Sequence, residues 1–451
     1  MVINWLKKEV FKMESFKNVI KWGIIAVVVL VVLGFWMFFG TSPAGFRYEY
    51  DASFGGIVIT GYNGSNPHLE IPSEIDGIPV VRIGVNAFSD SLRRRRVPNL
   101  ESVIIPYGVT SIGLFAFYDN HLVSVTIPDS VTYIGNWAFA RNQLTSVTIP
   151  DSVTDIGGSA FRRNQLTSIT IGNSVTTIER DAFSNNELTN ITIPDSVTSI
   201  RNGAFAQNQL TSVAFQNSVA YIGADAFWGN QLTSVVIPSS VTRVSREAFY
   251  RNPLISVYIP SSLTDIGIAA FGDSTFLIYY EYDAEIGGIV ITGSMGQIAH
   301  LEIPSEIQGI PVVRIGDWAF RNTGLSSVII PDSVVSIGDW AFGSNQLTEV
   351  TIPNSVTYIM SWAFAHNQLT NVTISNSITN IGPWTFAHNQ LTNVTIPNTV
   401  AIIEAGAFAH NQLASIIIPD SVTIIGDVAF SGNPLDEETR ASIRAINPDG
   451  Y

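Results

Sequence analysis

The sequence contains no cysteine, and its 451 residues include only six histidines. The missing cysteines exclude disulfide bonds, thiol catalysis and a lipid-modified cysteine. Charged residues make up only 13% of the chain, and no lysine follows Lys21. No two acidic residues have the spacing of an acid–base pair, and no glycine-rich phosphate loop occurs. The sequence therefore indicates no enzyme, no cofactor and no metal.

What the chain does contain is a phenylalanine that recurs every 22 residues in two series. The first series is Phe117, Phe139, Phe161, Phe183, Phe205, Phe227, Phe249 and Phe271, and the second is Phe320, Phe342, Phe364, Phe386, Phe408 and Phe430. Phe88 precedes the first series by 29 residues, so "SDSLRRRRVPNL" is expected to hold a loop inserted between two coils. Fifteen phenylalanines mark fifteen repeats. Such a period predicts a solenoid.

The repeats form two arrays, each with its own leader. "HLEIPSEIDGIPVVRIG" from His68 returns as "HLEIPSEIQGIPVVRIG" from His300, at an offset of 232 residues. We therefore predict a first leader with nine repeats over residues 46–275 and a second leader with six repeats over 276–435. Residues 436–451 are expected to be a C-terminal cap or tail.

The apolar positions of one repeat predict its local structure. In "LTSVTIP", Val147 and Ile149 alternate with polar residues, as in a half-buried strand, and Pro150 ends that strand. The following apolar residues are spaced by three and four, which predicts a turn or a short helical segment for the return arm. One repeat cannot bury its apolar face alone, so stacked coils with a parallel strand ladder, about 4.8 Å apart, are expected.

The phrase "L-x-x-V-x-I-P-x-S-V-x-x-I-G-x-x-A-F-x-x-N" resembles the BspA-like leucine-rich repeats of bacterial surface proteins, over about residues 46–435. The resemblance implies a surface location and binding of extracellular-matrix or host proteins. That family often has cysteine where this chain has asparagine, three residues after the phenylalanine. We expect the asparagines to form a ladder that satisfies backbone groups at the turn, because a short amide can do so locally.

The N-terminal segment predicts a membrane location. Residues 22–39, "WGIIAVVVLVVLGFWMFF", carry no charge and would span about 27 Å as a helix. All five lysines precede this run, which places residues 1–21 in the cytoplasm and the repeats outside. We therefore predict a single-pass signal anchor over residues 22–40. The alternative is a secreted protein, cleaved near Ala44 within "TSPAG".

Two features are candidate binding elements. The first is the tryptophan row Trp318, Trp340, Trp362 and Trp384, for which Trp137 is the single counterpart expected in the first array. Exposed aromatic residues can contact sugars or anchor a protein partner, but these tryptophans could also simply cover the edge of the coil. The second is the run Arg93, Arg94, Arg95 and Arg96, which could bind a polyanion or be an ordinary solvated loop.

A histidine row, His366, His388 and His410, repeats at 22-residue intervals and would stack at about 5 Å. No carboxylate recurs beside it, so a metal site is not predicted. The leading hypothesis is a membrane-anchored surface protein for adhesion or protein–protein interaction. A cell-envelope scaffold or glycan-binding module is the alternative, and an ice- or crystal-binding surface is a third. Nucleic acid is not an expected partner because the chain is acidic, with a net charge of −14.

Overall fold

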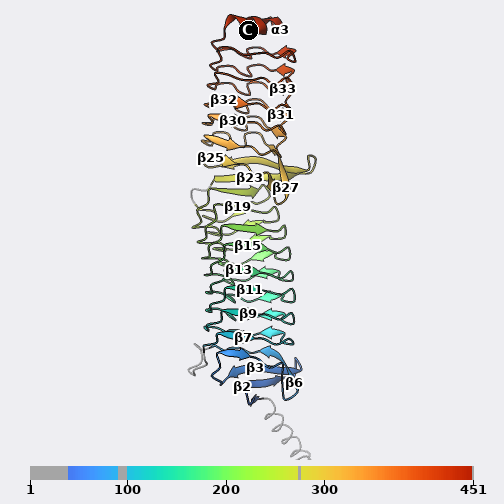
Figure 1. The fold of residues 1–451 in the computed structure, drawn as a ribbon, viewed down its shortest axis with the longest axis vertical. Coiled ribbons are helices and arrows are strands. Elements are labelled where there is room, and N and C mark those ends of the chain that lie inside the picture. Colours follow the sequence, from blue (N-terminus) through green and yellow to red (C-terminus); the bar gives the residue numbers. More distant parts are fainter. Residues whose placement is uncertain (1–38, 90–98, 273–275, 449–451) are drawn as a thin grey trace, which may run out of the picture. The chain divides into compact units, whose positions relative to one another are not determined.

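The computed structural model describes residues 39–89, 99–272 and 276–448. Its residues group into two compact units, Met1–Leu188 and Thr189–Tyr451, which are described separately. Both units consist of short strands connected by turns, as Figure 1 shows. The described part of each unit is therefore a stack of coils, as the repeat period predicts.

The first unit contains a leader and the first coils. Its strands are β1 (Phe39–Thr41), β2 (Phe46–Asp51), β3 (Gly56–Tyr62), β4 (His68–Glu70), β5 (Glu74–Ile75), β6 (Ile78–Ile83), β7 (Ser102–Ile104), β8 (Ser111–Ile112), β9 (Ser124–Thr126), β10 (Tyr133–Ile134), β11 (Ser146–Thr148), β12 (Asp155–Ile156), β13 (Ser168–Thr170) and β14 (Thr177–Ile178). The leader strands β1, β2 and β3 pair antiparallel, and β3 then continues in parallel through β6, β8, β10 and β12.

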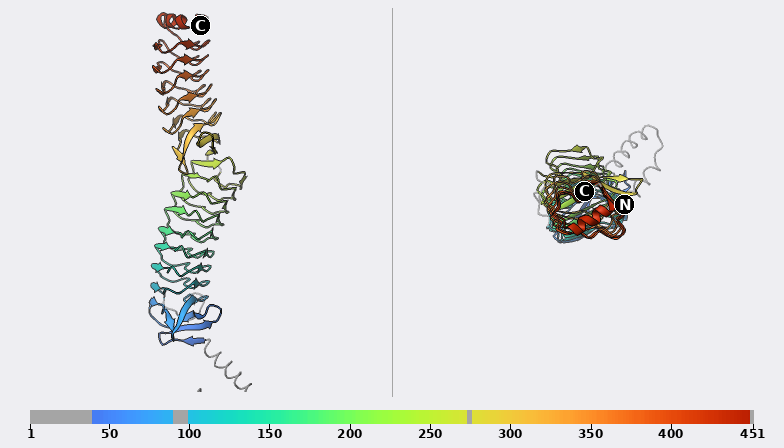
Figure 2. Two further views of the ribbon diagram at one scale, coloured as in Figure 1. Left: turned by 90° about the vertical axis from the view of Figure 1, so that its right-hand side faces the viewer. Right: turned by 90° about the horizontal axis from the view of Figure 1, so that it is seen from above.

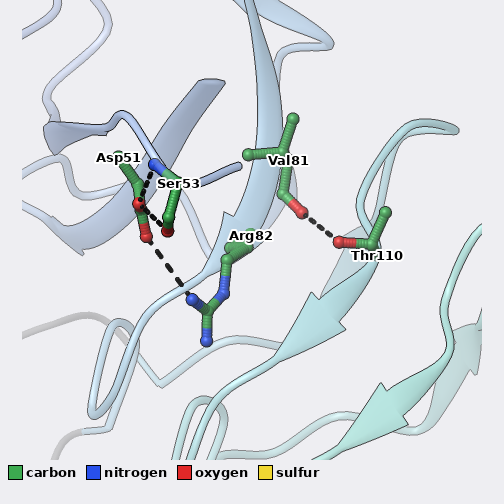
Figure 3. A network of polar contacts seen from close by, with 5 residues as sticks. All are labelled: Asp51, Ser53, Val81, Arg82 and Thr110. Atoms are coloured by element: carbon green, nitrogen blue, oxygen red, sulfur yellow. Dashed lines mark hydrogen bonds and ion pairs between the residues drawn. The ribbon is translucent and has the colours of Figure 1, made fainter. Parts of the chain in front are cut away.

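Polar side-chain contacts connect the leader to the first coil, as Figure 3 shows. Arg82 on β6 forms an ion pair with Asp51 at the end of β2, with 3.5 Å between nitrogen and oxygen. The Thr110 hydroxyl donates to the Val81 carbonyl at 3.1 Å. The leader is thus joined to the solenoid by side chains as well as by the sheet.

The structure corrects one boundary of the predicted membrane helix. Phe39 and Gly40 lie in strand β1 and pair with Glu49 and Tyr48 of β2, so the helix cannot extend to residue 40. Residues 22–38 lie outside the described residues. Within the described ranges, no helix is long and apolar enough to cross a membrane.

Most coils have two strands where the sequence predicted one, and the coils of Val394 and Ile416 keep only the second strand, as β34 and β35. Val147 on β11 is buried while Ser146 and Thr148 are exposed, which confirms the predicted alternation. The return arm carries the two-residue strand β12 followed by turns. Of the two alternatives predicted for the return arm, the turn is confirmed, and the short helical segment is wrong because the return arms of the described coils contain no helix.

The second unit begins at Thr189. Its elements are β15 (Asn190–Ile193), β16 (Ser199–Ile200), β17 (Ser212–Phe215), β18 (Tyr221–Ile222), β19 (Ser234–Val236), β20 (Arg243–Val244), β21 (Ser256–Pro260), β22 (Asp265–Ile266), β23 (Phe276–Asp283), β24 (Gly288–Met295), β25 (His300–Glu302), β26 (Glu306–Ile307), β27 (Ile310–Ile315), β28 (Ser327–Ile329), β29 (Ser336–Ile337), β30 (Glu349–Thr351), β31 (Tyr358–Ile359), β32 (Asn371–Thr373), β33 (Asn380–Ile381), β34 (Ile402–Ile403), β35 (Ile424–Ile425) and α3 (Glu437–Ile446).

The second leader has the same strand pairing as the first. Strand β23 pairs antiparallel with β24, and β24 pairs in parallel with β27, as β2 does with β3 and β3 with β6. Strand β21 of the preceding coil pairs in parallel with β23. The buried Tyr280 hydroxyl also donates to the Ile237 carbonyl at 2.6 Å. The second leader is therefore built into the stack of coils and continues its sheet.

Helix α3 caps the last coil, as Figure 2 shows. Asp436 accepts a hydrogen bond from the Thr439 N–H at 2.8 Å and so begins the helix. Asn447 donates to the Ile425 carbonyl of β35 at 2.8 Å. The helix covers an open solenoid end that would otherwise expose apolar residues.

The core is a ladder of phenylalanines. All fifteen repeat phenylalanines are at most 5% exposed. Within each unit their neighbouring rings stack with centroids 5.0–5.7 Å apart. Parallel rings at these distances lie in the favourable offset-stacked range.

The predicted asparagine ladder is confirmed, and it also connects coils. Asn164 donates to the carbonyls of Phe139 and Phe161 at 2.9 and 3.0 Å. Its carbonyl oxygen accepts from the Leu144 N–H at 3.1 Å. One buried amide therefore satisfies three backbone groups, two of them in the preceding coil.

Candidate functional site

The candidate site begins at a corner of the coil, two residues before the ladder phenylalanine. The tryptophan row occupies this corner with left-handed φ angles of 63°, 56°, 61° and 56° for Trp318, Trp340, Trp362 and Trp384. Phe115 and Ser159 have the same conformation in the first unit, with φ of 54° and 58°. The repeat therefore imposes this backbone. A bulky residue in it costs about 1–2 kcal/mol, so backbone preference does not explain the tryptophans.

The four tryptophans form one stack. The centroid distances are 6.1 Å from Trp318 to Trp340, 5.0 Å from Trp340 to Trp362 and 4.9 Å from Trp362 to Trp384. Trp318 is 54% exposed, and the other three are half-buried. Because neighbouring rings cover both faces of Trp340 and Trp362, the exposed part of these rings is their edge.

The histidine row extends the stack from a second corner, two residues after the phenylalanine. His366, His388 and His410 stack with centroids 4.4 Å apart. The His366 ring is parallel to Trp340 and Trp362 at 5.9 and 6.1 Å. We call these four tryptophans and three histidines, together with Arg321, the aromatic stripe.

Arg321 is the permanent cation of the aromatic stripe. Its guanidinium carbon lies 4.5 Å from the ring centroid of Trp318 and 4.3 Å from that of Trp340, as in a cation–π contact. The carboxylate of the neighbouring Asp317 is engaged elsewhere. It pairs with Arg314 at 3.6 Å and accepts from the Asp339 N–H at 3.0 Å.

Two histidines of the stripe, His366 and His388, have pKa values below the ordinary value of an imidazole. Burial lowers the pKa of His366, and the charge of Arg321 lowers it further. Burial also lowers the pKa of His388, as do its stacked neighbours His366 and His410. Acidification therefore changes the stripe from an aromatic surface with one cation into one with several.

The structure brings together the sequence-predicted tryptophans but shows nothing of the arginine run. Trp318, Trp340, Trp362 and Trp384 are contiguous, as the 22-residue spacing predicted, and their binding role stays a prediction. Arg93, Arg94, Arg95 and Arg96 lie outside the described residues. Among the residues that the structure describes, no group of three or more potential ligands is placed to hold a metal ion.

Sequence reasoning missed Arg321 and a smaller cluster in the first unit. Phe115 occupies the same corner as Trp137, and their rings stack at 6.1 Å. Tyr118 packs edge-on against Trp137, and Arg162 lies 5.6 Å from its centroid. Trp137 is therefore not the single aromatic counterpart in the first array. Aligning every residue two positions before the ladder phenylalanine would have revealed Phe115.

The strand face provides a second, more polar surface. In the first unit, a groove of about 620 Å³ is lined by Ser124, Thr126, Ser146, Thr148 and the nearby Asp129 and Asp151. In the second, a groove of about 740 Å³ includes Ile329, Glu349 and Thr351. Because the strand face is concave at these grooves, it does not favour contact with a flat ice or crystal lattice.

Comparison with known proteins assigns the family. The family model for the BspA type leucine rich repeat region matches residues 83–210, 198–311 and 313–436. The chain belongs to this family, as the repeat motif indicated. No curated protein matches the chain by sequence.

Solved structures of bacterial repeat proteins are similar. A leucine rich cell surface protein from Faecalibacterium prausnitzii is 28% identical, with 92% of this chain and 98% of that chain covered and a TM-score of 0.34. A leucine-rich repeat protein from Bacteroides ovatus is 22% identical over 86% and 91%, with a TM-score of 0.41. The pneumococcal vaccine antigen PcpA is 16% identical over 90% and 96%, with a TM-score of 0.39. All three TM-scores are below 0.5, so the family assignment rests on the sequence match.

Proposed function

We propose that this protein is a bacterial surface protein that binds extracellular macromolecules, in adhesion or in protein–protein interaction. Family membership and the repeat architecture support this role, because solenoids offer extended surfaces to large ligands. The role requires no chemistry, and we propose that the protein is not an enzyme.

We further propose that the N-terminal apolar segment anchors the chain in the membrane. The uncharged run ending at Phe39 and the lysines before it support an arrangement with residues 1–21 in the cytoplasm and the repeats outside. Strand β1 begins at Phe39, the last residue of this run. Release after cleavage near Ala44 is the alternative.

The observation that carries the proposal is the aromatic stripe. Seven stacked rings and one guanidinium lie at corners of successive coils, and Trp318 is 54% exposed. Large aromatic side chains supply contact area at low entropic cost, and a few of them can dominate an interface. Partially exposed aromatic residues at a corner that disfavours them are better suited to binding than to packing alone.

A glycan-binding module or envelope scaffold is the second candidate function. The observation in its favour is the regularity of the stripe, which places Trp362 with His366 and Trp384 with His388 in adjacent coils. A polymer of identical units can repeat the same contacts in each coil. An irregular protein surface has no such match to the period of the solenoid.

Binding of the full chain to an array of glycans and matrix proteins tests the proposal. Trp318→Ser should reduce capture at least tenfold, about 1.4 kcal/mol, because it removes the most exposed tryptophan of the stripe. Serine is already accommodated at this corner in Ser159, so the fold should be retained. Glu247→Ser at the equivalent corner outside the stripe is the matched control. Equal capture by wild type and Trp318→Ser would exclude the stripe as the binding surface.

A further inference from the structure

We propose that the aromatic stripe is a binding site for an anionic polysaccharide, whose capture strengthens as the pH falls. This inference rests on the proposed function and names the ligand class and regulation of the same site. It follows from which parts of the rings are exposed, from the charges in the stripe and from its repetition.

The first step is the exposed part of the rings. Trp362 lies between Trp340 and Trp384, with ring planes within 4° of parallel, and it is still partly exposed. With both faces covered, its edge is what meets the solvent. The edge of an aromatic ring is its electropositive part, and the indole N–H is a donor that lies in the ring plane. Such a surface attracts anions and acceptors, and it offers little face for stacking a neutral sugar.

The second step is the charge. Arg321 lies against Trp318 and Trp340. Burial lowers the pKa of His366 and the charge of Arg321 lowers it further, so a cation is close to both rows. Burial lowers the pKa of His388, and so do its neighbours His366 and His410. No carboxylate contributes to this shift. Arg321, which is always charged, and three ionisable histidines thus lie together on an acidic chain.

Three of the four acidic side chains near these corners contact groups outside the stripe. Asp317 pairs with Arg314, and Asp427 accepts from the Asn447 side chain at 3.5 Å. Glu404 accepts from the Asn380 side chain at 3.1 Å. The fourth is Asp339, directly before Trp340 in the chain, whose backbone N–H donates to the Asp317 carboxylate. Among the described residues, no carboxylate forms an ion pair with Arg321 or with a stripe histidine, so these cationic and ionisable groups can face a ligand.

The third step is the coupling to pH. Stacked imidazoles 4.4 Å apart repel one another when all are charged, and the central His388, with a ring on either side, has a lowered pKa in the free protein. A bound row of anions would favour the charged forms. Binding therefore takes up protons, and the affinity must increase on acidification through the range in which the histidines titrate.

The fourth step distinguishes a polysaccharide from an acidic protein segment. The tryptophans recur once per coil from Trp318 to Trp384, and the histidines do so from His366 to His410. Beyond the histidine corner, the exposed glutamines are Gln346, Gln368, Gln390 and Gln412. A polymer with charged groups at regular intervals can make the same contacts in successive coils. The repetition of the site therefore favours a polysaccharide that carries carboxylate or sulfate groups.

Dextran sulfate is the probe, because its sulfates stay ionised over the pH range used, and neutral dextran is its control. We expect the full chain to bind dextran sulfate at least tenfold more tightly at pH 5.5 than at pH 7.5, at constant ionic strength, and to bind dextran weakly at both. Constant ionic strength is needed because salt screens exposed charges. Arg321→Gln should weaken binding at both pH values.

The triple variant His366→Gln, His388→Gln and His410→Gln should remove the pH dependence. Gln207 has the same left-handed backbone at this corner in another coil, with φ of 55°, so the fold should be retained and circular dichroism checks it. The matched control is His68→Gln with His300→Gln, in the two leaders, where each histidine contacts a serine hydroxyl. These changes should leave the pH dependence intact.

Three results would overturn the inference: a pH dependence that survives in the triple variant, equal binding of neutral dextran, or preferential binding of poly-L-glutamate, which would indicate an acidic protein partner. If dextran sulfate fails but Trp318→Ser still abolishes capture on the array, only the ligand class is wrong. If both experiments fail, the proposed function is wrong as well.

Discussion

At the scale of single residues, the asparagine of each repeat is the most demanding position. Asn164 satisfies two carbonyls and one N–H inside the solenoid, and its side chain is buried. Removing it leaves these groups without partners and without water. Each such group costs about 1–3 kcal/mol.

We therefore expect Asn164→Ala to lower the free energy of unfolding by about 3 kcal/mol or more, measured by urea denaturation. Gln165→Ala is the control, because that neighbouring side chain is exposed. A loss below about 1 kcal/mol would mean that the amide ladder contributes little and that other groups or water replace it.

The ladder phenylalanine is the second critical residue. Phe205 is fully buried. Phe205→Ala should destabilise the protein by about 3–5 kcal/mol, through lost burial and the cavity left behind. Thermal or urea unfolding measures this change. A change below about 1 kcal/mol would contradict the assignment of this side chain to the core.

At the scale of elements, the histidine row makes stability depend on pH. The pKa values of His366 and His388 are lowered in the folded state below the ordinary imidazole value of about 6.5. The unfolded chain therefore binds more protons than the folded chain just below that pH, and stability falls as the pH falls through it.

We expect urea midpoints at pH 7.5 and 5.5 to show a larger acid loss for the wild type than for the variant with all three stripe histidines replaced by glutamine. The leader variant His68→Gln with His300→Gln should behave as the wild type. Equal losses in the wild type and the stripe variant would show that the stacked imidazoles do not resist protonation.

Several elements could be predicted from the sequence because side-chain chemistry repeats at fixed intervals. The alternation of Val147 and Ile149 with polar residues indicated the strand. The repeated phenylalanines indicated the core, and the repeated asparagines, such as Asn164, indicated the amide ladder. The second strand was missed, since Asp155 and Ile156 form only a two-residue strand whose pairing lies in other coils. A two-residue strand has no periodicity of its own.

The candidate site was only partly predictable. The tryptophan and histidine rows follow from the 22-residue spacing. Their left-handed corners and the covered ring faces do not, because hydrogen bonds and contacts between coils create them. Arg321 occurs once, so no repetition drew attention to it, and only the three-dimensional contact with Trp318 and Trp340 reveals its role.

At the scale of the whole molecule, the proposed topology makes a direct prediction. Protease added to intact cells should remove the repeats and spare a tag at the N-terminus, because residues 1–21 are proposed to lie in the cytoplasm. Digestion of that tag would contradict the orientation. A mature protein beginning near Gly45 would instead support cleavage and release.

The duplication raises the question of which array binds. The first array has an aromatic cluster of Phe115, Tyr118 and Trp137, and the second has the longer aromatic stripe. The second array offers more contiguous rings and carries the histidine row. We therefore predict that most of the binding lies in the second array.

Adhesion of intact cells tests the central claim most directly. Cells displaying equal amounts of wild type or of the Trp318→Ser, Arg321→Gln double variant would be applied to a surface coated with the ligand identified by the array. We predict that the double variant reduces the number of attached cells at least tenfold, while the control Glu247→Ser attaches as the wild type does. Equal attachment of all three would contradict the claim that this is a surface protein that binds through the aromatic stripe.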